Sequence, residues 1–564
     1  MRVMSVLGVA CAAGVGLGAW DGGARQSEKV WVFLRDKGVV DVRAAVDTAA
    51  GALPGSVKAR WARADWRGDE GDLPVSEVYT QALSDAGVRV LRSSRWLNAV
   101  SARLSSDQKL AIEKMPFVLH TRPVAVYRRP LEPIVPVTPI AAGGRSVGAH
   151  TMSYGPSLSQ WQMVQVPLLH DLGYTGSGVT ICMMDTGFKK DHEVFASTTR
   201  ADEWDFIFDD GNTQDEPGDA PGAESHGTST WSLTGGRKDG TLIGGAFSAR
   251  FLLAKTEDIR SETVVEEDNW VAALEWADER GADIVSSSLG YSDWYSANDF
   301  DGRTAITSIA ASAAAKRGIL VVNAMGNEGP GRQSLTAPAD AFGIVAVGAV
   351  DSGRRIASFS SRGPSADDRL KPEVCAQGVA AFVASSFDTT DYGTGNGTSF
   401  SCPITAGAAG ALLSARRDWS PGQLREALTM TASRASAPDN NYGRGIVQVL
   451  AAYNYLPRNA VEIDHTALGN QSAATSGYKV TAVVRAYWGV DESQLMLYYR
   501  TAAAGAFQSI PLQKKSNNKF SATIPRQPAS TTVSYYLQAK DTKGRKRRRP
   551  YDSPATLYSF LVVP

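Results

Sequence analysis

The sequence predicts an α/β fold with a doubly wound parallel sheet, preceded by an α+β segment and followed by a β-sandwich. Two patterns support this prediction. Between about residues 151 and 457, apolar strand-like runs alternate with helical stretches such as 269–280, 304–317 and 421–431, which is typical of a parallel sheet with helices on both faces. From 458 to 564, short alternating strands separated by turn residues replace the helices, as expected of two packed antiparallel sheets.

Length and charge limit the classes of function. The chain has 564 residues, enough for about three domains of roughly 100–200 residues each. Its 58 basic and 58 acidic residues balance, so the net charge favours neither nucleic acid nor an anionic membrane as a partner. No segment after the N-terminus is an unbroken apolar run of about 18 residues, and we therefore expect no transmembrane helix. We expect a monomer.

The N-terminus has the features of a targeting segment. Arg2 precedes the apolar stretch 3–19, and polar residues follow at 21–23. This pattern predicts a signal peptide over residues 1–23 and a secreted, extracellular or periplasmic protein. The alternative is a lipoprotein anchored through Cys11, because Leu7 to Cys11 faintly matches a lipoprotein cleavage site.

Residues 24–129 have a periodicity of their own. Strands are predicted at 30–34, 97–104 and 117–127, and amphipathic helices at 74–86 and 105–115. This is an α+β pattern. Residues 130–150 then contain Pro133, Pro136 and Pro139, which predicts an extended linker.

Three short motifs in the central part carry groups suited to nucleophilic catalysis. Asp185-Thr186-Gly187 ends an apolar run, Ser225-His226-Gly227 opens a small-residue stretch, and Gly397-Thr398-Ser399 begins a helix-compatible run. A serine hydroxyl attacks efficiently only when a neutral imidazole takes its proton. A carboxylate must in turn orient the imidazole and stabilise its charged form.

These motifs, in the order Asp, His, Ser, resemble the catalytic segments of the subtilisin-like serine proteases, the subtilases of peptidase family S8. The resemblance implies a subtilisin-like fold and a serine endopeptidase that hydrolyses proteins or peptides through an acyl-enzyme. Asp185, His226 and Ser399 would be its catalytic residues.

Two further motifs resemble substrate-binding segments of the same family. Residues 323–329 resemble the segment that supplies a side-chain amide to the oxyanion hole, which implies this role for Asn327. Residues 284–290 resemble the strand that pairs with an extended substrate. Ser288, Leu289 and Gly290, together with Gly326, would then bind substrate, with the pocket floor within 330–342.

The N-terminal α+β segment resembles, more loosely, the inhibitory propeptide of secreted subtilases. The resemblance rests on residues 96–104 and the helix that follows them. It implies a zymogen that processes itself and has its own propeptide as an intramolecular inhibitor. The alternative is a small independent module.

Metal and thiol chemistry have little support in the sequence. We expect no cofactor and no metal, with calcium left open, because Val194 stands where well-known subtilisins carry a calcium-binding carboxylate and loop 235–242 lacks their calcium-binding pattern. Cys182, Cys375 and Cys402 have apolar neighbours and no Cys-x-x-Cys spacing. We interpret them as buried small side chains, although one disulfide or a thiol-protease role is also compatible with the sequence.

The C-terminal part and the type of reaction each leave more than one interpretation open. Residues 458–564 resemble immunoglobulin-like or fibronectin type III modules, whose function the sequence does not indicate. The basic run 543–549 is interpreted as a solvated hairpin tip, and polyanion binding is its second interpretation. Hydrolysis is the first interpretation of the activity. The alternatives are acyl transfer to an amine, as in a peptide ligase or cyclase, and a catalytically idle protein that serves in adhesion.

Overall fold

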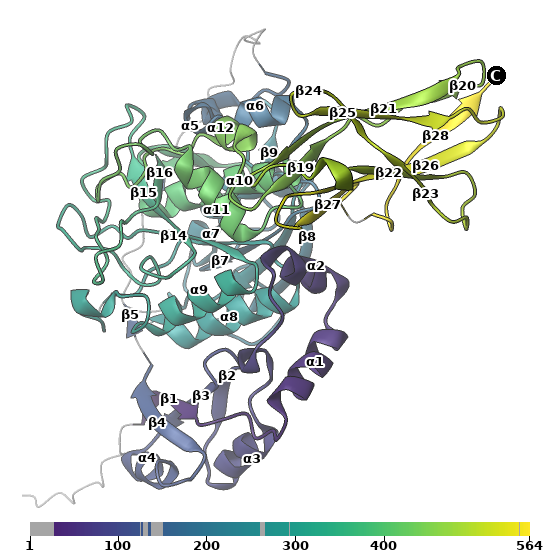
Figure 1. Cartoon of the computed structure of the whole chain (residues 1–564). Helices are drawn as coiled ribbons and strands as arrows, with labels where there is room; N and C mark the ends of the chain where they lie inside the picture. The colour runs from purple at the N-terminus through teal and green to yellow at the C-terminus, as the bar shows by residue number, and fades with distance from the viewer. Residues whose placement is uncertain are drawn as a thin grey trace, which may run out of the picture.

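A computed structural model of the chain describes residues 27–124, 126–127, 134–136, 150–259, 265–292, 294–551 and 553–564. The predicted signal peptide at 1–23, with Cys11, and most of the predicted linker lie outside these residues. Figure 1 shows an N-terminal part in purple, a central part in teal and green, and a C-terminal part in yellow-green to yellow.

The central part is built on a seven-stranded sheet with the order β16-β15-β14-β13-β7-β11-β8. All neighbouring strands in it are parallel, which confirms the predicted doubly wound parallel sheet. The strands are β7 (Thr180–Asp185), β8 (Thr199–Asp205), β11 (Arg250–Lys255), β13 (Ile284–Ser287), β14 (Leu320–Ala324), β15 (Val345–Val350) and β16 (Val374–Gln377).

Helices cover both faces of this sheet (Figure 1). Along β7, Ile181 and Met183 join the hydrophobic core on one face, whereas Cys182 and Met184 join the core on the other. Burial on both faces explains why the strands are apolar throughout. The first face holds α5 (Leu158–Val164), α6 (Val166–Asp171), α7 (Glu224–Gly235), α10 (Thr398–Ala415), α11 (Pro421–Met430) and α12 (Val449–Asn454), and the second holds α8 (Glu267–Glu279) and α9 (Ile306–Lys316).

The N-terminal part is a four-stranded antiparallel sheet with the order β2-β3-β1-β4 and helices around it. Val30 and Val32 of β1 face the core of this part, and Trp31 between them is buried in the core that contains α8 and α9. The sheet therefore packs directly on these two helices (Figure 1). Its elements are β1 (Glu28–Leu34), α1 (Val42–Ala52), α2 (Gly55–Ala64), α3 (Glu77–Asp85), β2 (Val90–Ser94), β3 (Ala99–Leu104), α4 (Ser106–Ile112) and β4 (Val118–Pro123).

The C-terminal part consists of two sheets, β19-β21-β25-β24 and β20-β28-β26-β22-β23. A separate hydrophobic core lies between them, which confirms the predicted β-sandwich. Its strands are β19 (Val461–Asp464), β20 (Gln471–Ser472), β21 (Gly477–Ala486), β22 (Met496–Arg500), β23 (Gln508–Pro511), β24 (Gln513–Ser516), β25 (Lys519–Pro525), β26 (Thr532–Lys540), β27 (Lys546–Arg549) and β28 (Tyr558–Val563).

The basic run 543–549 is not simply a solvated hairpin tip, as its composition predicted. Its second half is β27, which pairs with β26 in antiparallel register. Arg549 Nε donates a hydrogen bond of 3.1 Å to the carbonyl oxygen of Ile463. Backbone pairing and this contact hold the arginines in a strand, so only the first half of the run forms a turn.

Short strands join the N-terminal and central parts. β5 (Val126–Tyr127) pairs antiparallel with β12 (Val265–Glu266), directly before α8. β6 (Val135–Pro136) pairs antiparallel with β18 (Tyr392–Gly395), which also pairs with β17 (Ala381–Ala384). A hairpin links β9 (Arg237–Lys238) and β10 (Leu242–Ile243).

Within the described ranges, no helix is long and apolar enough to cross a membrane.

A buried histidine makes the fold of the central part sensitive to acid. His170 Nε2 donates to the carbonyl oxygen of Gly245 (2.9 Å), and Nδ1 accepts from the Tyr154 hydroxyl (2.6 Å). Burial lowers the pKa of His170 from 6.5 to about 4. Because the unfolded chain binds this proton more readily, the stability that His170 contributes is present above pH 6.5 and is lost as the pH falls to 4.

We therefore expect the free energy of unfolding of the protein to fall by up to about 3 kcal/mol from this group between pH 6.5 and 4. His170→Gln, which does not titrate, should reduce that slope. Urea unfolding at several pH values measures both proteins. Identical slopes would show that His170 does not titrate in this window.

Candidate active site

The carboxyl ends of two adjacent strands place the first candidate groups. β7 ends at Asp185, and Met184 lies opposite Ser287 at the end of β13. Asp185 and Ser288 therefore leave the same edge of the sheet side by side. In open α/β sheets this edge is where ligands and reacting groups lie.

Asp185 and His226 form a buried hydrogen-bonded pair. Asp185 Oδ1 lies 2.6 Å from His226 Nδ1, and the two side chains are 1% and 4% exposed. The same carboxylate accepts from the backbone N–H of Thr186 (2.8 Å) and from the Thr230 hydroxyl (2.9 Å). Because a carboxylate only accepts, Nδ1 carries the proton and Nε2 carries the lone pair that a general base requires.

The first turn of α7 carries His226 and is held against the end of β7. Asp215 Oδ1 accepts a hydrogen bond of 2.8 Å from the backbone N–H of Glu224 at the start of this helix. Burial, followed by the nearby Glu224, raises the pKa of Asp215 to about 6, so above this pH its charge complements the helix N-terminus. Gly227 allows the close approach, because a Cβ there would lie 2.0 Å from the carbonyl oxygen of Gly187.

Ser399 lies in the first turn of α10, which begins at Thr398 as the sequence predicts. Ser399 Oγ donates to the carbonyl oxygen of Ser288 (3.4 Å), and Ser288 Oγ donates to that of Ser399 (2.8 Å). The Phe400 ring centroid lies 6.0 Å from that of His226. The serine, the imidazole and the end of β13 are thus brought into one neighbourhood.

The Asn327 side chain is oriented by the residue before Ser399. Its Oδ1 accepts from the backbone N–H (2.9 Å) and from the hydroxyl (3.0 Å) of Thr398. The oxygen is engaged there, the NH₂ group is on the other side of the same amide, and Asn327 lines the cavity beside Ser399. Such a donor is suited to an oxyanion that develops next to the serine.

A cavity of about 30 Å³ lies beside Ser399. It brings together all the predicted substrate-binding residues, Ser288, Leu289, Gly290 and Gly326, with Asn327 and Ser399. Ala324, Glu328, Thr336 and Thr398 complete its lining. The sequence did not single out Glu328 or Thr336, although Thr336 lies within the predicted floor 330–342.

The residues at the expected calcium site do not fit that ion. The Val194 side chain is fully buried in the apolar core, and residues 237–243 form a β-hairpin instead of a loop of oxygen ligands. Among the described residues, one acidic cluster joins Asp205, Asp210 and Glu216. The Lys255 ammonium lies 2.8 Å from Asp205 and already supplies positive charge there.

The three cysteines within the described residues are buried and free. Cys182, Cys375 and Cys402 form no disulfide in the structure. Burial raises the pKa of the Cys402 thiol to about 12, and its Sγ donates to the carbonyl oxygens of Ser287 (3.4 Å) and Val322 (3.2 Å). A thiol held in this form is a poor nucleophile, which removes support from a thiol-protease role.

Comparisons with known proteins agree with this geometry. The family model described as "Subtilase family" matches residues 176–445, and the model described as "Peptidase S8 propeptide domain, Bacteroidota" matches residues 29–133. The chain is 31% identical over 308 residues to subtilisin of Bacillus pumilus, covering 54% of this chain and 99% of that protein. It is 28% identical over 374 residues to subtilisin E of Bacillus subtilis, covering 66% of this chain and 84% of that protein.

A solved structure extends the likeness to almost the whole chain. Fervidolysin from Fervidobacterium pennivorans, a keratinolytic enzyme related to subtilisin, aligns with a TM-score of 0.54 and 18% identity. The alignment covers 97% of this chain and 79% of that one, and at this identity it supports the fold alone. The sequence relatives and the fold together show that this chain belongs to the subtilase family of serine endopeptidases.

Proposed function

We propose that this chain is a secreted serine endopeptidase, made as a self-processing proprotein, with Asp185, His226 and Ser399 as its catalytic triad. The observation that carries the proposal is the 2.6 Å pair of Asp185 and His226 beside the N-terminal turn of the helix that carries Ser399. We further propose that the mature enzyme is a monomer and that it reaches the cell exterior or periplasm through residues 1–23.

The reaction follows from the positions of these groups. His226 Nε2 takes the proton of Ser399 Oγ as the oxygen attacks the substrate carbonyl carbon. The Asn327 amide and the backbone N–H of Ser399 stabilise the resulting oxyanion. When the C–N bond breaks, His226 gives its proton to the leaving amine. Water then attacks the acyl-enzyme by the same route and releases the acid and free Ser399.

The N-terminal part has the contacts expected of an inhibitor that stays bound in the precursor. The Glu275 carboxylate on α8 accepts from Ser94 Oγ (2.5 Å) and from the backbone N–H groups of Arg95 (3.0 Å) and Trp96 (3.2 Å). Glu267 accepts from Trp31 Nε1 (3.1 Å). These bonds attach the four-stranded sheet to the helix that begins beside β12.

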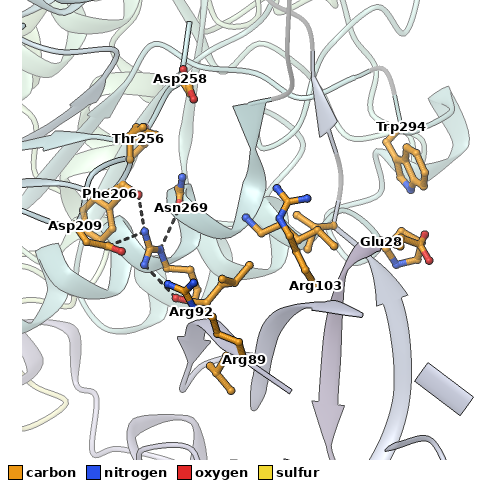
Figure 2. Close-up of a pocket in the computed structure, with 16 residues that line it drawn as sticks. Glu28, Arg89, Arg92, Arg103, Phe206, Asp209, Thr256, Asp258, Asn269 and Trp294 are labelled. Atoms are coloured by element: carbon orange, nitrogen blue, oxygen red, sulfur yellow. Dashed lines mark hydrogen bonds and ion pairs between the residues drawn. The ribbon is translucent and has the colours of Figure 1, made fainter. Parts of the chain in front are cut away.

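The same interface contains an open cavity. Figure 2 shows this space, about 730 Å³, between the two parts. Arg92 crosses it at one side, with Nε 3.0 Å from Asn269 Oδ1 and Nη2 2.8 Å from Asp209 Oδ1. This open space limits the area over which the two parts are in direct contact, so the interface is suited to a segment that is later released.

Two strand pairings hold the segment after the N-terminal part on either side of the active site. β5 pairs with β12, next to α8, whose Trp270 Nε1 donates to Ser287 Oγ (3.0 Å) at the end of β13. β6 pairs with β18, which ends at Gly395, shortly before Ser399. Tyr127 and Val135 therefore lie on different sides of the site, and we propose that maturation cleaves between them.

We propose boundaries for the parts that agree with this cleavage. The signal peptide would span 1–23, the propeptide 24–129, the linker 130–150, the catalytic domain 151–457 and the immunoglobulin- or fibronectin-like sandwich 458–564. No observation in the described residues favours peptide ligation, cyclisation or adhesion over hydrolysis.

Self-processing is tested with the Ser399→Ala protein. In a host without other processing proteases, this variant should accumulate uncut, whereas the wild type should yield a mature species whose first residue lies between Arg128 and Val135. Intact mass and N-terminal sequencing measure both. Normal cutting of the Ser399→Ala chain would refute self-processing, and a wild-type N-terminus outside this range would refute the proposed cleavage between Tyr127 and Val135.

Asn327→Ala should lower kcat by about 10²–10³-fold with little change in KM, because its donor bond forms mainly in the transition state. Steady-state kinetics on a chromogenic peptide substrate measures both constants. Thr398→Val should give a smaller loss of kcat, since it removes one of the two bonds that orient the amide. A change confined to KM would remove Asn327 from the proposed role.

We also propose that the mature enzyme has no strong calcium site at Val194, and chelation tests this. Because the Val194 side chain offers no ligand oxygen, a calcium chelator should shift the Tm of the mature enzyme by no more than about 2 °C. Loss of a tightly bound ion would instead lower the free energy of unfolding by several kcal/mol. Differential scanning calorimetry with and without added calcium measures this shift. A large, calcium-reversible drop would show that a strong site exists elsewhere.

A further inference from the structure

The walls of the cavity beside Ser399 are two backbone segments. Residues 288–290 follow β13, and residues 324–326 begin at the last residue of β14. Under the proposed function, on which this inference rests, the side chain before the scissile bond enters between these walls. The size and shape of the substrate side chain that fits therefore depend on the group that lies between Gly290 and Gly326.

Thr336 occupies the space between the walls. A Cβ placed on Gly290 would lie 2.2 Å from Thr336 Oγ1, and one placed on Gly326 would lie 3.0 Å from the same atom. The Thr336 side chain therefore reaches both walls. A planar ring inserted between them would have to take the place of this side chain.

The backbone holds Thr336 in position. Its N–H donates to the carbonyl oxygen of Met325 (3.3 Å), and the next residue, Ala337, exchanges two hydrogen bonds of 2.8 and 3.1 Å with Tyr291. Thr336 is thus fixed to both walls and is only 2% exposed. Its backbone cannot move aside without breaking these bonds.

The Thr336 hydroxyl affects the cavity by the space that it fills and not by a hydrogen bond. Thr336 Oγ1 has no hydrogen-bond partner among the described residues. Thr336→Val therefore removes no hydrogen bond and keeps the same shape, so it is a matched control for the space that the side chain fills.

A carboxylate lies at the mouth of the cavity. Glu328 Oε2 accepts from Ser361 Oγ (3.0 Å) and would lie 2.6 Å from a Cβ on Gly326. An acidic substrate side chain would meet like charge there, and a lysine is the side chain that would gain from it.

We propose that Thr336 is the specificity-determining residue of this peptidase and that it excludes aromatic side chains from the position before the scissile bond. Short aliphatic side chains, such as those of alanine and leucine, are accepted. The substrates are then proteins cut after small or aliphatic residues. Tyr127 is the one aromatic residue in the proposed maturation segment 127–135, so cleavage directly after it would contradict the proposal.

The test uses the mature enzyme and four tetrapeptide p-nitroanilides that differ only in the residue before the anilide: alanine, leucine, phenylalanine or lysine. Rates are expressed per molecule labelled at the serine by a fluorophosphonate, so misfolded protein does not count. For the wild type, kcat/KM for phenylalanine should be at least about 10-fold below that for leucine, a typical penalty when a pocket cannot hold its substrate.

Thr336→Gly should raise the ratio of kcat/KM for phenylalanine to kcat/KM for leucine at least about 10-fold. Thr336→Ala should raise this ratio by an intermediate factor. Thr336→Val should leave the ratio within about 2-fold of the wild-type value. A wild type that cleaves after phenylalanine as fast as after leucine would overturn the proposal. So would an unchanged ratio in Thr336→Gly and Thr336→Ala, or preference for lysine, which would assign selectivity to Glu328. Failure to label and to cleave any substrate would overturn the proposed function as well.

Discussion

Close packing of α10 on one face of the parallel sheet, with its first turn at the carboxyl ends of the strands, is the constraint on which the candidate site depends. Every residue of this helix except Ser414 is buried. Its small residues allow that depth, and where it passes residue 245 two glycines meet: a Cβ on Gly407 would lie 3.0 Å from the Cα of Gly245. The first turn also bonds to the sheet, since Ser401 Oγ donates to the carbonyl oxygen of Ala376 (3.1 Å). Ser399 therefore takes its position from the core.

Charge, by contrast, directs the docking of the N-terminal part. Arg60 and Arg63 of α2 are buried and pair with Asp278 and Asp283 of the central part. Desolvation offsets much of the attraction in such pairs, while removing one partner is costly. The pairs thus fix how the two parts are oriented and add little net affinity, which is compatible with a segment that is later released.

Much of this architecture could be predicted from local patterns. Helix α1 was not predicted, and it buries only Val46. Three other exceptions share a cause. The parallel sheet, the β-sandwich and the turns bearing Asp185, His226 and Ser399 follow from apolar runs and short motifs. Helix α2 was missed because buried arginines replace its apolar stripe, and β27 was missed because its arginines are held by a neighbouring strand. Thr336 reaches the cavity only through its pairing with a distant segment near Tyr291. Each of these three depends on a partner far away in the sequence, which a local pattern does not contain.

The central claim, that the sheet edge and α10 together make Ser399 a reactive nucleophile, is tested most directly by mapping the site of fluorophosphonate labelling. The purified wild-type protein is labelled, digested and analysed by mass spectrometry, with the Ser399→Ala protein as the control. The account predicts one modified peptide, carrying the label on Ser399, and no labelling of the variant. Modification of another residue, or equal labelling of the variant, would contradict it.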